Sequence, residues 1–264
     1  MMDEKDLKEY EDNIRMMQGI KFNNKYKYIR GKQLTDPGSG TRVYDIDNSR
    51  LPSVTTILGA TKNQQILKDW KAKVGEENAE RIKNHSSKRG TAMDKFLESH
   101  IQGVGYDDVT SIGQEAKPMA QKIIEVGLTP VEEIYGSEIM LHYPGLYAGS
   151  TDLVCLHNDM ETIVDFKQAN RPKKEEWIED YYLQIAAYAL AHDYTHKSQI
   201  RQGVIMVCTP DLYYQEFKMQ DADLRKWKHK WLKRLDMYHE IQFDDKEKAN
   251  VNMEEEDFNE PKTT

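Results

Sequence analysis

Cysteine is scarce in this chain of 264 residues, which contains only Cys155 and Cys208. Two thiols cannot build a disulfide framework, and one chain with two thiols cannot form a four-cysteine zinc or iron–sulfur site. Both lie in apolar runs that resemble strands. We therefore expect two buried thiols in a reducing compartment.

Long apolar runs are missing as well. No stretch approaches the ~20 residues that a membrane span needs, and the mean hydropathy is -0.81. The first residues, MMDEKDLKEYED, are acidic, which is unlike a signal peptide or an arginine-rich transit peptide. These features predict a cytoplasmic protein that has no membrane as a partner.

Two common ligand motifs are incomplete. The glycine-containing segment DPGSG at 36–40 lacks the GKS/T ending of a phosphate-binding P-loop. His192 and His196 have the spacing of zinc ligands, but the glutamate of an H-E-x-x-H motif is absent. Neither segment indicates a nucleotide or zinc enzyme.

The charge is unevenly distributed. The net charge is -8, but residues 1–12 carry -4 and residues 243–264 carry -5, which leaves the body near neutrality. Residues 62–89 hold eight Lys/Arg against four acids, and residues 225–235 hold six Lys/Arg and no acid. Basic patches of this kind suit nucleic acid. Solvated faces of charged helices are the alternative.

Hydrophobic periodicity predicts an α/β domain with a mixed sheet. Residues 1–18 are predicted to be a helical or disordered arm, and Pro118 is expected in the first turn of its helix. Strands are expected at 26–34, 41–47, 131–142, 146–157, 160–168, 200–208 and 211–218, and helices at 63–84, 87–101, 114–126, 175–193 and 221–241.

Three regions follow from this order. Residues 1–50 are predicted to form an N-terminal arm and β-hairpin extension, and 51–242 the main domain. The acidic segment 243–264 has few apolar residues and is predicted to be a disordered tail, with a possible role in binding a protein partner.

Asp165 and Lys167 are two residues apart on a predicted strand, so they extend from the same face. A two-residue turn at 158–159 would place Asp152 opposite Asp165 on the neighbouring strand. Two carboxylates that face each other repel, and a divalent cation such as Mg²⁺ compensates well. An exposed hairpin face with ordinary salt bridges is the alternative, since D-x-K is a common tripeptide.

The helix that follows this strand is apolar almost all round, which indicates burial. Gln184 and Tyr188 lie four residues apart on one face, with Tyr181 one turn earlier. A polar Gln184 on a buried helix needs a partner. If the helix packs across the sheet, the carboxylate site can provide it.

These elements together resemble the PD-(D/E)XK nuclease superfamily in its RecB-like branch, and within it the exonucleases of mitochondrial genome maintenance and of phage type. The matching pieces are Glu138 in the first strand, GSTD with Asp152, Asp165-Phe166-Lys167, and Gln184 with Tyr188. The segments LPSVTTIL, ILKDWK, RGTAMDKFLE and DADLRKWKHKWLKRLDMY extend the resemblance over about residues 50–240.

The resemblance implies an αβββαβ restriction-endonuclease-like core with an N-terminal extension. It implies that Asp152, Asp165 and the backbone carbonyl of Phe166 bind Mg²⁺ or Mn²⁺, and that Lys167 positions the attacking water. Gln184 and Tyr188 would complete the catalytic site and contact DNA. The activity implied is that of a monomeric, metal-dependent exonuclease of single-stranded DNA ends, in replication, repair or recombination in a bacterial or phage-infected cell.

One position departs from the family pattern. RecB-like members usually carry a histidine four residues after the glycine of the preceding helix, and here Gly90 is followed by Asp94. Asp94 shares a helix face with Glu98 and is a candidate metal ligand with oxygen in place of nitrogen. The change could equally weaken or abolish activity. Glu98 and Glu138 are expected to support the site.

Several polar residues are candidate DNA-binding groups, each with an ordinary structural alternative. Hydroxyls near a predicted helix start can cap the helix or bind phosphate, and basic residues can bind phosphate or face solvent. The candidates are Ser53, Thr55, Arg89, Arg171, Lys173 and Lys174. Three other functions remain open: an inactive DNA-binding protein on a nuclease scaffold, a structure-specific endonuclease, and an adaptor that uses the acidic tail.

Overall fold

The computed structural model of this chain describes residues 20–259, with side chains described for 20–65 and 68–244. The predicted arm at 1–18 lies outside the described residues. In this part of the chain the elements are β1 (Lys21–Phe22), β2 (Lys32–Thr35), β3 (Arg42–Ile46), β4 (Ser49–Pro52), α2 (Val54–Thr61), α3 (Gln65–Val74), α4 (Glu76–Ile101), α5 (Ser111–Val126), β5 (Val131–Tyr143), β6 (Tyr147–His157), β7 (Met160–Gln168), η1 (Glu175–Trp177), α6 (Glu179–His196), β8 (Gln202–Cys208), β9 (Tyr214–Gln220) and α7 (Ala222–Asn259).

The main sheet is mixed and has the strand order β1-β5-β6-β7-β8-β9. Strands β5, β6 and β7 form an antiparallel meander. Strand β8 lies parallel to β7, which requires a crossover, and α6 provides it. The α/β class and the αβββαβ order, here α5-β5-β6-β7-α6-β8, are confirmed. A separate antiparallel sheet, β2-β3-β4, is the N-terminal extension.

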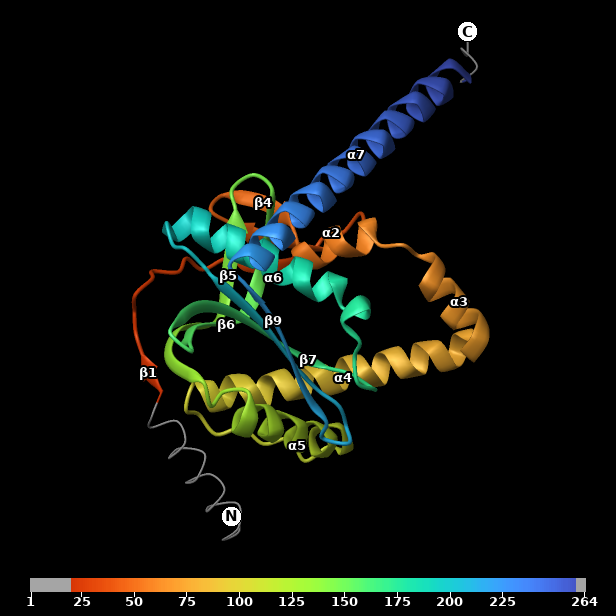
Figure 1. The fold of residues 1–264 in the computed structure, drawn as a ribbon. Helices are drawn as coiled ribbons and strands as arrows, with labels where there is room; N and C mark the ends of the chain where they lie inside the picture. The colour runs from red at the N-terminus through yellow and green to blue at the C-terminus, as the bar shows by residue number, and fades with distance from the viewer. Residues whose placement is uncertain (1–19, 260–264) are drawn as a thin grey trace.

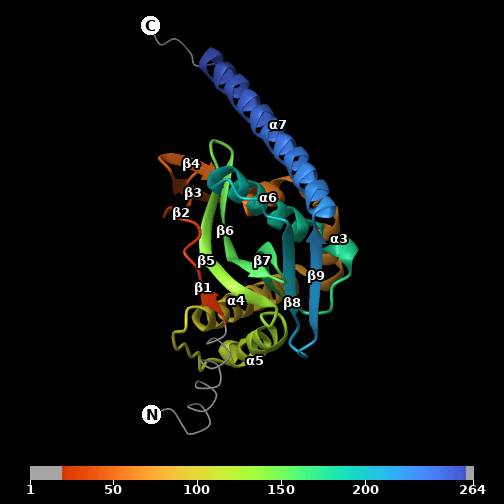
Figure 2. The same ribbon diagram turned by 60° about the vertical axis from the view of Figure 1, so that its left-hand side comes forward.

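Helices cover both faces of the main sheet (Figures 1 and 2). Val154 and Ile163 pack in the core on the side of α2, α6 and α7. Leu153 and Val164, their neighbours in the chain, pack in the core on the side of α4 and α5. Alternate residues of β6 and β7 therefore extend to opposite faces, and Asp165 extends to the α6 side.

Helix α6 is buried almost all round, as predicted, because it lies between the sheet and the helices α2 and α7. Helix α7 packs on it through the predicted apolar stripe. Trp231 is completely buried in that stripe and meets Tyr147 of β6 edge to face, with ring centroids 5.0 Å apart. This packing fixes α6 over the end of the sheet where β6 and β7 separate.

Several predicted boundaries were wrong. The predicted helix 63–84 is divided at Gly75, whose φ of 83° breaks the helix, and α4 then runs without a break over the junction predicted near 85. Pro118 lies inside α5 rather than in its first turn, because Thr110 caps the helix. Of the predicted strand 26–34, only the end forms β2.

The three predicted regions stay predictions. Strand β4 spans the boundary placed at residue 50. Helix α7 continues to Asn259 and does not end at 241 as predicted. No glycine or proline interrupts the sequence between these points, and polar residues alone do not break a helix. No helix among residues 20–259 is long and apolar enough to cross a membrane.

Candidate active site

The site forms where β6 leaves β7. Strand β6 pairs with β7 up to Leu153↔Val164, while β7 continues beside β8 as far as Gln168. Side chains occupy the gap that results. The hydroxyl of Thr151 lies 3.4 Å from the carbonyl oxygen of Val164, and one oxygen of Asp152 accepts a hydrogen bond from the Phe166 N–H at 2.5 Å.

The predicted register is confirmed for the paired residues, and its continuation sets Asp152 opposite Asp165. Asp165 is 1% exposed and forms an ion pair with Lys167. Its Oδ2 is the oxygen that the Lys167 ammonium contacts, and no other partner of this oxygen lies among the described residues. One ammonium balances only part of the negative charge that Asp152 and Asp165 bring together, and a divalent cation would balance the rest.

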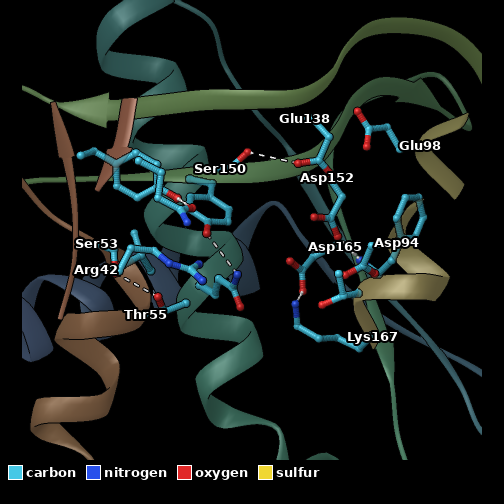
Figure 3. A pocket seen from close by; sticks show the side chains of 18 of the residues that line it. Arg42, Ser53, Thr55, Asp94, Glu98, Glu138, Ser150, Asp152, Asp165 and Lys167 are labelled. Carbon is cyan, nitrogen blue, oxygen red and sulfur yellow. Dashed lines mark hydrogen bonds and ion pairs between the residues drawn. The ribbon is translucent and has the colours of Figure 1, made fainter. Parts of the chain in front are cut away.

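Glu138 adds a third carboxylate from the next strand. The β5–β6 pairs Ser137↔Leu153 and Ile139↔Thr151 set it opposite Asp152. Its φ is 52°, a value that costs energy for a residue with a side chain. Glu138, Asp152 and Asp165 thus form a row across three adjacent strands (Figure 3).

Burial and mutual repulsion govern the ionisation of this row. Burial and the charge of Asp165 raise the pKa of Asp152 well above its ordinary range. Burial also raises the pKa of Asp165, against the effect of the Lys167 ammonium. For Glu138, burial and the charge of Glu98 raise the pKa to about 7. Burial lowers the pKa of Lys167, but the charges of Asp165 and Asp152 outweigh burial and raise this pKa above its ordinary value. Lys167 therefore stays protonated.

Helix α4 supplies Asp94 and Glu98 to the same pocket. Burial and the charge of Asp165 raise the pKa of Asp94 to about 7, although Lys167 opposes the shift. That Asp94 adds a third metal ligand stays a prediction. Among the described side chains, no group of three or more His, Cys, Asp or Glu is already arranged to hold a metal ion.

Helix α6 forms the opposite wall. The amide of Gln184 donates a hydrogen bond to the hydroxyl of Tyr188 at 3.1 Å, so the predicted pair on one helix face is in contact, and both line the pocket. The Lys167 ammonium lies 5.5 Å from the ring centre of Tyr181. An aromatic face at this distance favours the cation and helps to hold Lys167 in place.

The absence of a side chain at Gly149 leaves room for the ring of Tyr188. A Cβ at this position would lie 2.6 Å from Cε1 and 3.0 Å from the hydroxyl of Tyr188. We expect Gly149→Ala to displace the ring, to lower the free energy of unfolding by about 1–3 kcal/mol and to reduce any activity of the site. Urea unfolding measures the first effect. The control for stability is Gly59→Ala in helix α2, where a Cβ meets no atom within 4 Å. Unchanged stability in Gly149→Ala would mean that the ring is not confined.

A third wall comes from the N-terminal extension. Ser53 caps α2, accepting from the Thr56 N–H at 2.9 Å as one of its predicted alternatives, and it lines the pocket with Thr55. Strands β2 and β3 add residues that the sequence did not reveal, because no local pattern connects this hairpin with residues a hundred positions later. They are Gln33, Arg42 and Tyr44, and the complete pocket has a volume of about 270 Å³ (Figure 3).

The structure does not support Arg89 as a DNA-binding residue. Its side chain is 4% exposed. The guanidinium donates to Gln168 at 2.9 Å, to Glu115 at 3.3 Å and to Asn170. Arg89 therefore ties α4 and α5 to the end of β7 and has no donor directed at a ligand.

The basic residues after β7 lie outside the pocket lining. The N–H of Lys173 donates to Gln215 at 2.6 Å, and the Lys174 ammonium lies 5.2 Å from the ring centre of Trp177. Arg171 is exposed on the same loop. All three stay predictions as phosphate contacts at a distance from the carboxylates.

The donor set fits a hard divalent cation. Mg²⁺ is usually bound by one or two carboxylates and retains several waters, and Asp152 and Asp165 provide such a pair. The buried Oδ2 of Asp165 contacts the Lys167 ammonium, and a bound cation would share this carboxylate with it. With no thiolate or imidazole in the pocket lining, the site favours Mg²⁺ or Mn²⁺ over softer metals.

No family model matches this sequence, and no curated protein matches it. Solved structures give distant likenesses. A candidate exonuclease from Eubacterium rectale has 12% identity and a TM-score of 0.43, over 58% of this chain and 64% of its own. An alkaline exonuclease from Laribacter hongkongensis has 14% identity and a TM-score of 0.30, over 61% and 85%. The protein SSO0001 has 14% identity and a TM-score of 0.27, over 56% and 84%.

The chain thus spans less than two thirds of the length of the Eubacterium rectale protein. At these identities and TM-scores the likenesses carry no argument about activity. The function has to be argued from the site of this chain.

Proposed function

We propose that this protein is a metal-dependent nuclease that hydrolyses phosphodiester bonds of DNA, acting from single-stranded ends. The observation that carries the proposal is the row of carboxylates on β5, β6 and β7, in which Asp165 is buried and ion-paired with a protonated lysine. A carboxylate row next to one ammonium suits a reaction in which a cation and a phosphate meet.

Asp152 and Asp165 would hold Mg²⁺ or Mn²⁺, together with the Phe166 carbonyl that the resemblance implies. When bound, the cation supplies Lewis-acid stabilisation of the phosphate and lowers the pKa of water. The Phe166 N–H donates a hydrogen bond to one carboxylate oxygen of Asp152 at 2.5 Å, and this bond orients the side chain for the role. Glu138 and Asp94 border the pair and add negative charge that attracts the cation.

Lys167 would act as a fixed positive charge. Because its pKa is raised, it cannot remove a proton near neutral pH. It can donate hydrogen bonds to the attacking water or to a phosphate oxygen, where negative charge develops in the transition state. Gln184 and Tyr188, joined at 3.1 Å, can orient the substrate from α6.

A DNA-binding protein without activity is the second candidate, because Asp94 replaces the histidine of the family pattern. A structure-specific endonuclease is the third. Circular single-stranded DNA distinguishes the last from an exonuclease, since only an endonuclease cuts it.

The test of the proposal is digestion of end-labelled linear single-stranded DNA with Mg²⁺, with Mn²⁺ and with EDTA. We expect shortening with either cation and none with EDTA, because two carboxylates that repel each other need the cation to bind phosphate. Binding without cleavage in every metal would refute the nuclease and support the inactive protein. Asp94→His would then show whether this position silences the site.

A further inference from the structure

A second pocket adjoins the candidate active site. It lies between the β2–β3 turn, α2 and α7, and its volume is about 540 Å³, within the range of pockets that hold small ligands. Its lining includes the hydroxyls of Ser39 and Thr41, the ring of Tyr238 and the amide of Gln242. The two hydroxyls lie 2.8 Å apart and give the pocket a polar edge.

The two pockets share Arg42 and Thr55 in their linings. They are therefore neighbours at the start of α2, with these two residues between them. Figure 3 shows Arg42, Ser53 and Thr55 together on the side of the pocket away from Lys167 and Asp94.

The charges of the two pockets differ. Five carboxylates line the first, from Asp94, Glu98, Glu138, Asp152 and Asp165. No acidic residue of the described chain lines the second. An anionic backbone is repelled by carboxylates without a cation, whereas it meets hydroxyls, an amide and a guanidinium in the second pocket.

Arg42 stands at the junction and has no ion pair with a described carboxylate. Its side chain is exposed, and its charge lowers the pKa of the neighbouring Tyr44, although burial raises that pKa overall. Its carbonyl accepts hydrogen bonds from the Ser53 N–H at 3.2 Å and the Thr56 hydroxyl at 2.8 Å. The backbone of Arg42 is thus fixed, and its exposed guanidinium, which lies beside the Tyr44 hydroxyl, has further N–H donors for a phosphate.

We propose that the nucleotide next to the scissile phosphate occupies the second pocket, with its phosphate on Arg42 and its base in the space between α2 and α7. The proposal rests on the nuclease function and specifies the path of the strand, from the carboxylates past the start of α2 to the space between α2 and α7.

Gly59 offers a direct test, because it lines the second pocket and a Cβ built on it meets no atom within 4 Å. A larger residue can enter here without a backbone clash, and any residue but proline favours a helix more than glycine does. Gly59→Ala, Gly59→Leu and Gly59→Trp fill the pocket in steps. Val109→Trp is the control, since Val109 is 79% exposed on a loop remote from both pockets.

Two readouts separate this proposal from the proposed function. Anisotropy of a labelled thymidine oligonucleotide, with Ca²⁺ or EDTA, measures binding without cleavage. Rates with Mg²⁺ on the same oligonucleotide and on bis(p-nitrophenyl) phosphate compare a strand with a diester too small to reach the second pocket. We expect Gly59→Trp to weaken oligonucleotide binding by about tenfold, because the indole occupies the space of the base, and to reduce cleavage of the oligonucleotide more than that of the small diester.

Arg42→Gln gives an independent measure. We expect it to weaken binding and to reduce the slope of log affinity against log salt by about one, as the loss of one phosphate contact does. Equal binding by wild type, Gly59→Trp and Arg42→Gln would overturn the path, even if the wild type cleaves DNA. Graded loss of binding in the Gly59 series, with no cleavage by any variant or by wild type, would support the path and refute the nuclease.

Discussion

Asp152→Asn is expected to abolish metal-dependent cleavage of single-stranded DNA and, at the same time, to stabilise the protein in EDTA. The loss of activity should be about a thousandfold or more, as when a group that stabilises transition-state charge is removed. In the wild type the Phe166 N–H donates a hydrogen bond to Asp152 at 2.5 Å. The asparagine amide keeps an oxygen that can accept the same hydrogen bond. The charge that faces Asp165 disappears, and with it the repulsion.

The pH dependence follows from the direction of the shift. Because burial and Asp165 raise the folded-state pKa of Asp152, its ionisation costs the folded state stability. This cost is absent below the ordinary pKa of about 4 and appears as the pH rises through the raised value. In EDTA the wild type should therefore lose stability as the pH increases from about 4 to the raised pKa. Asp152→Asn should lose less stability over the same pH range.

Calorimetry with and without Mg²⁺ measures both effects. We expect an increase in melting temperature of about 2–4 °C for each kcal/mol gained, and a smaller stabilisation by Mg²⁺ than in the wild type, because a ligand of the cation is missing. Asp69→Asn is the control, as Asp69 is exposed and bonded only to Gln65 among the described residues. Full activity of Asp152→Asn would exclude Asp152 from the metal ligands.

Lys167→Met is expected to remove activity with the opposite effect on stability. Methionine keeps the length of the side chain but not its charge, so we expect cleavage to fall by about a hundredfold or more. Asp165, which is 1% exposed, loses the ammonium that neutralises it. Removal of one partner from a buried ion pair typically costs about 3–5 kcal/mol.

The double variant Asp165→Asn/Lys167→Met is the matched control for this cost. It removes both charges, and we expect it to be more stable than Lys167→Met while it remains inactive. Mg²⁺ should stabilise Lys167→Met more than it stabilises the wild type, since the cation can replace the ammonium beside Asp165. If Lys167→Met were as stable as the wild type in EDTA, the ion pair would have no role in the fold.

The sequence by itself determined the centre of the fold. The turn at residues 158 and 159 and the alternation of Val164 and Phe166 with Asp165 and Lys167 set the register of β6 and β7, because side-chain direction in a strand has a period of two. The all-round apolar character of α6 predicted its burial in the same way. These features are local, and local spacing is sufficient to predict them.

The tertiary structure alone decided how the site is enclosed. Arg42 and Tyr44 reach the pocket because the N-terminal sheet packs against β6, at Ala148, and no sequence spacing predicts a contact between segments so far apart. Burial likewise decided the role of Arg89, whose charge alone suggested a DNA contact but whose donors are directed at Gln168 and Glu115. Spacing specifies which side chains share a face, whereas packing decides which of them remain available to a ligand.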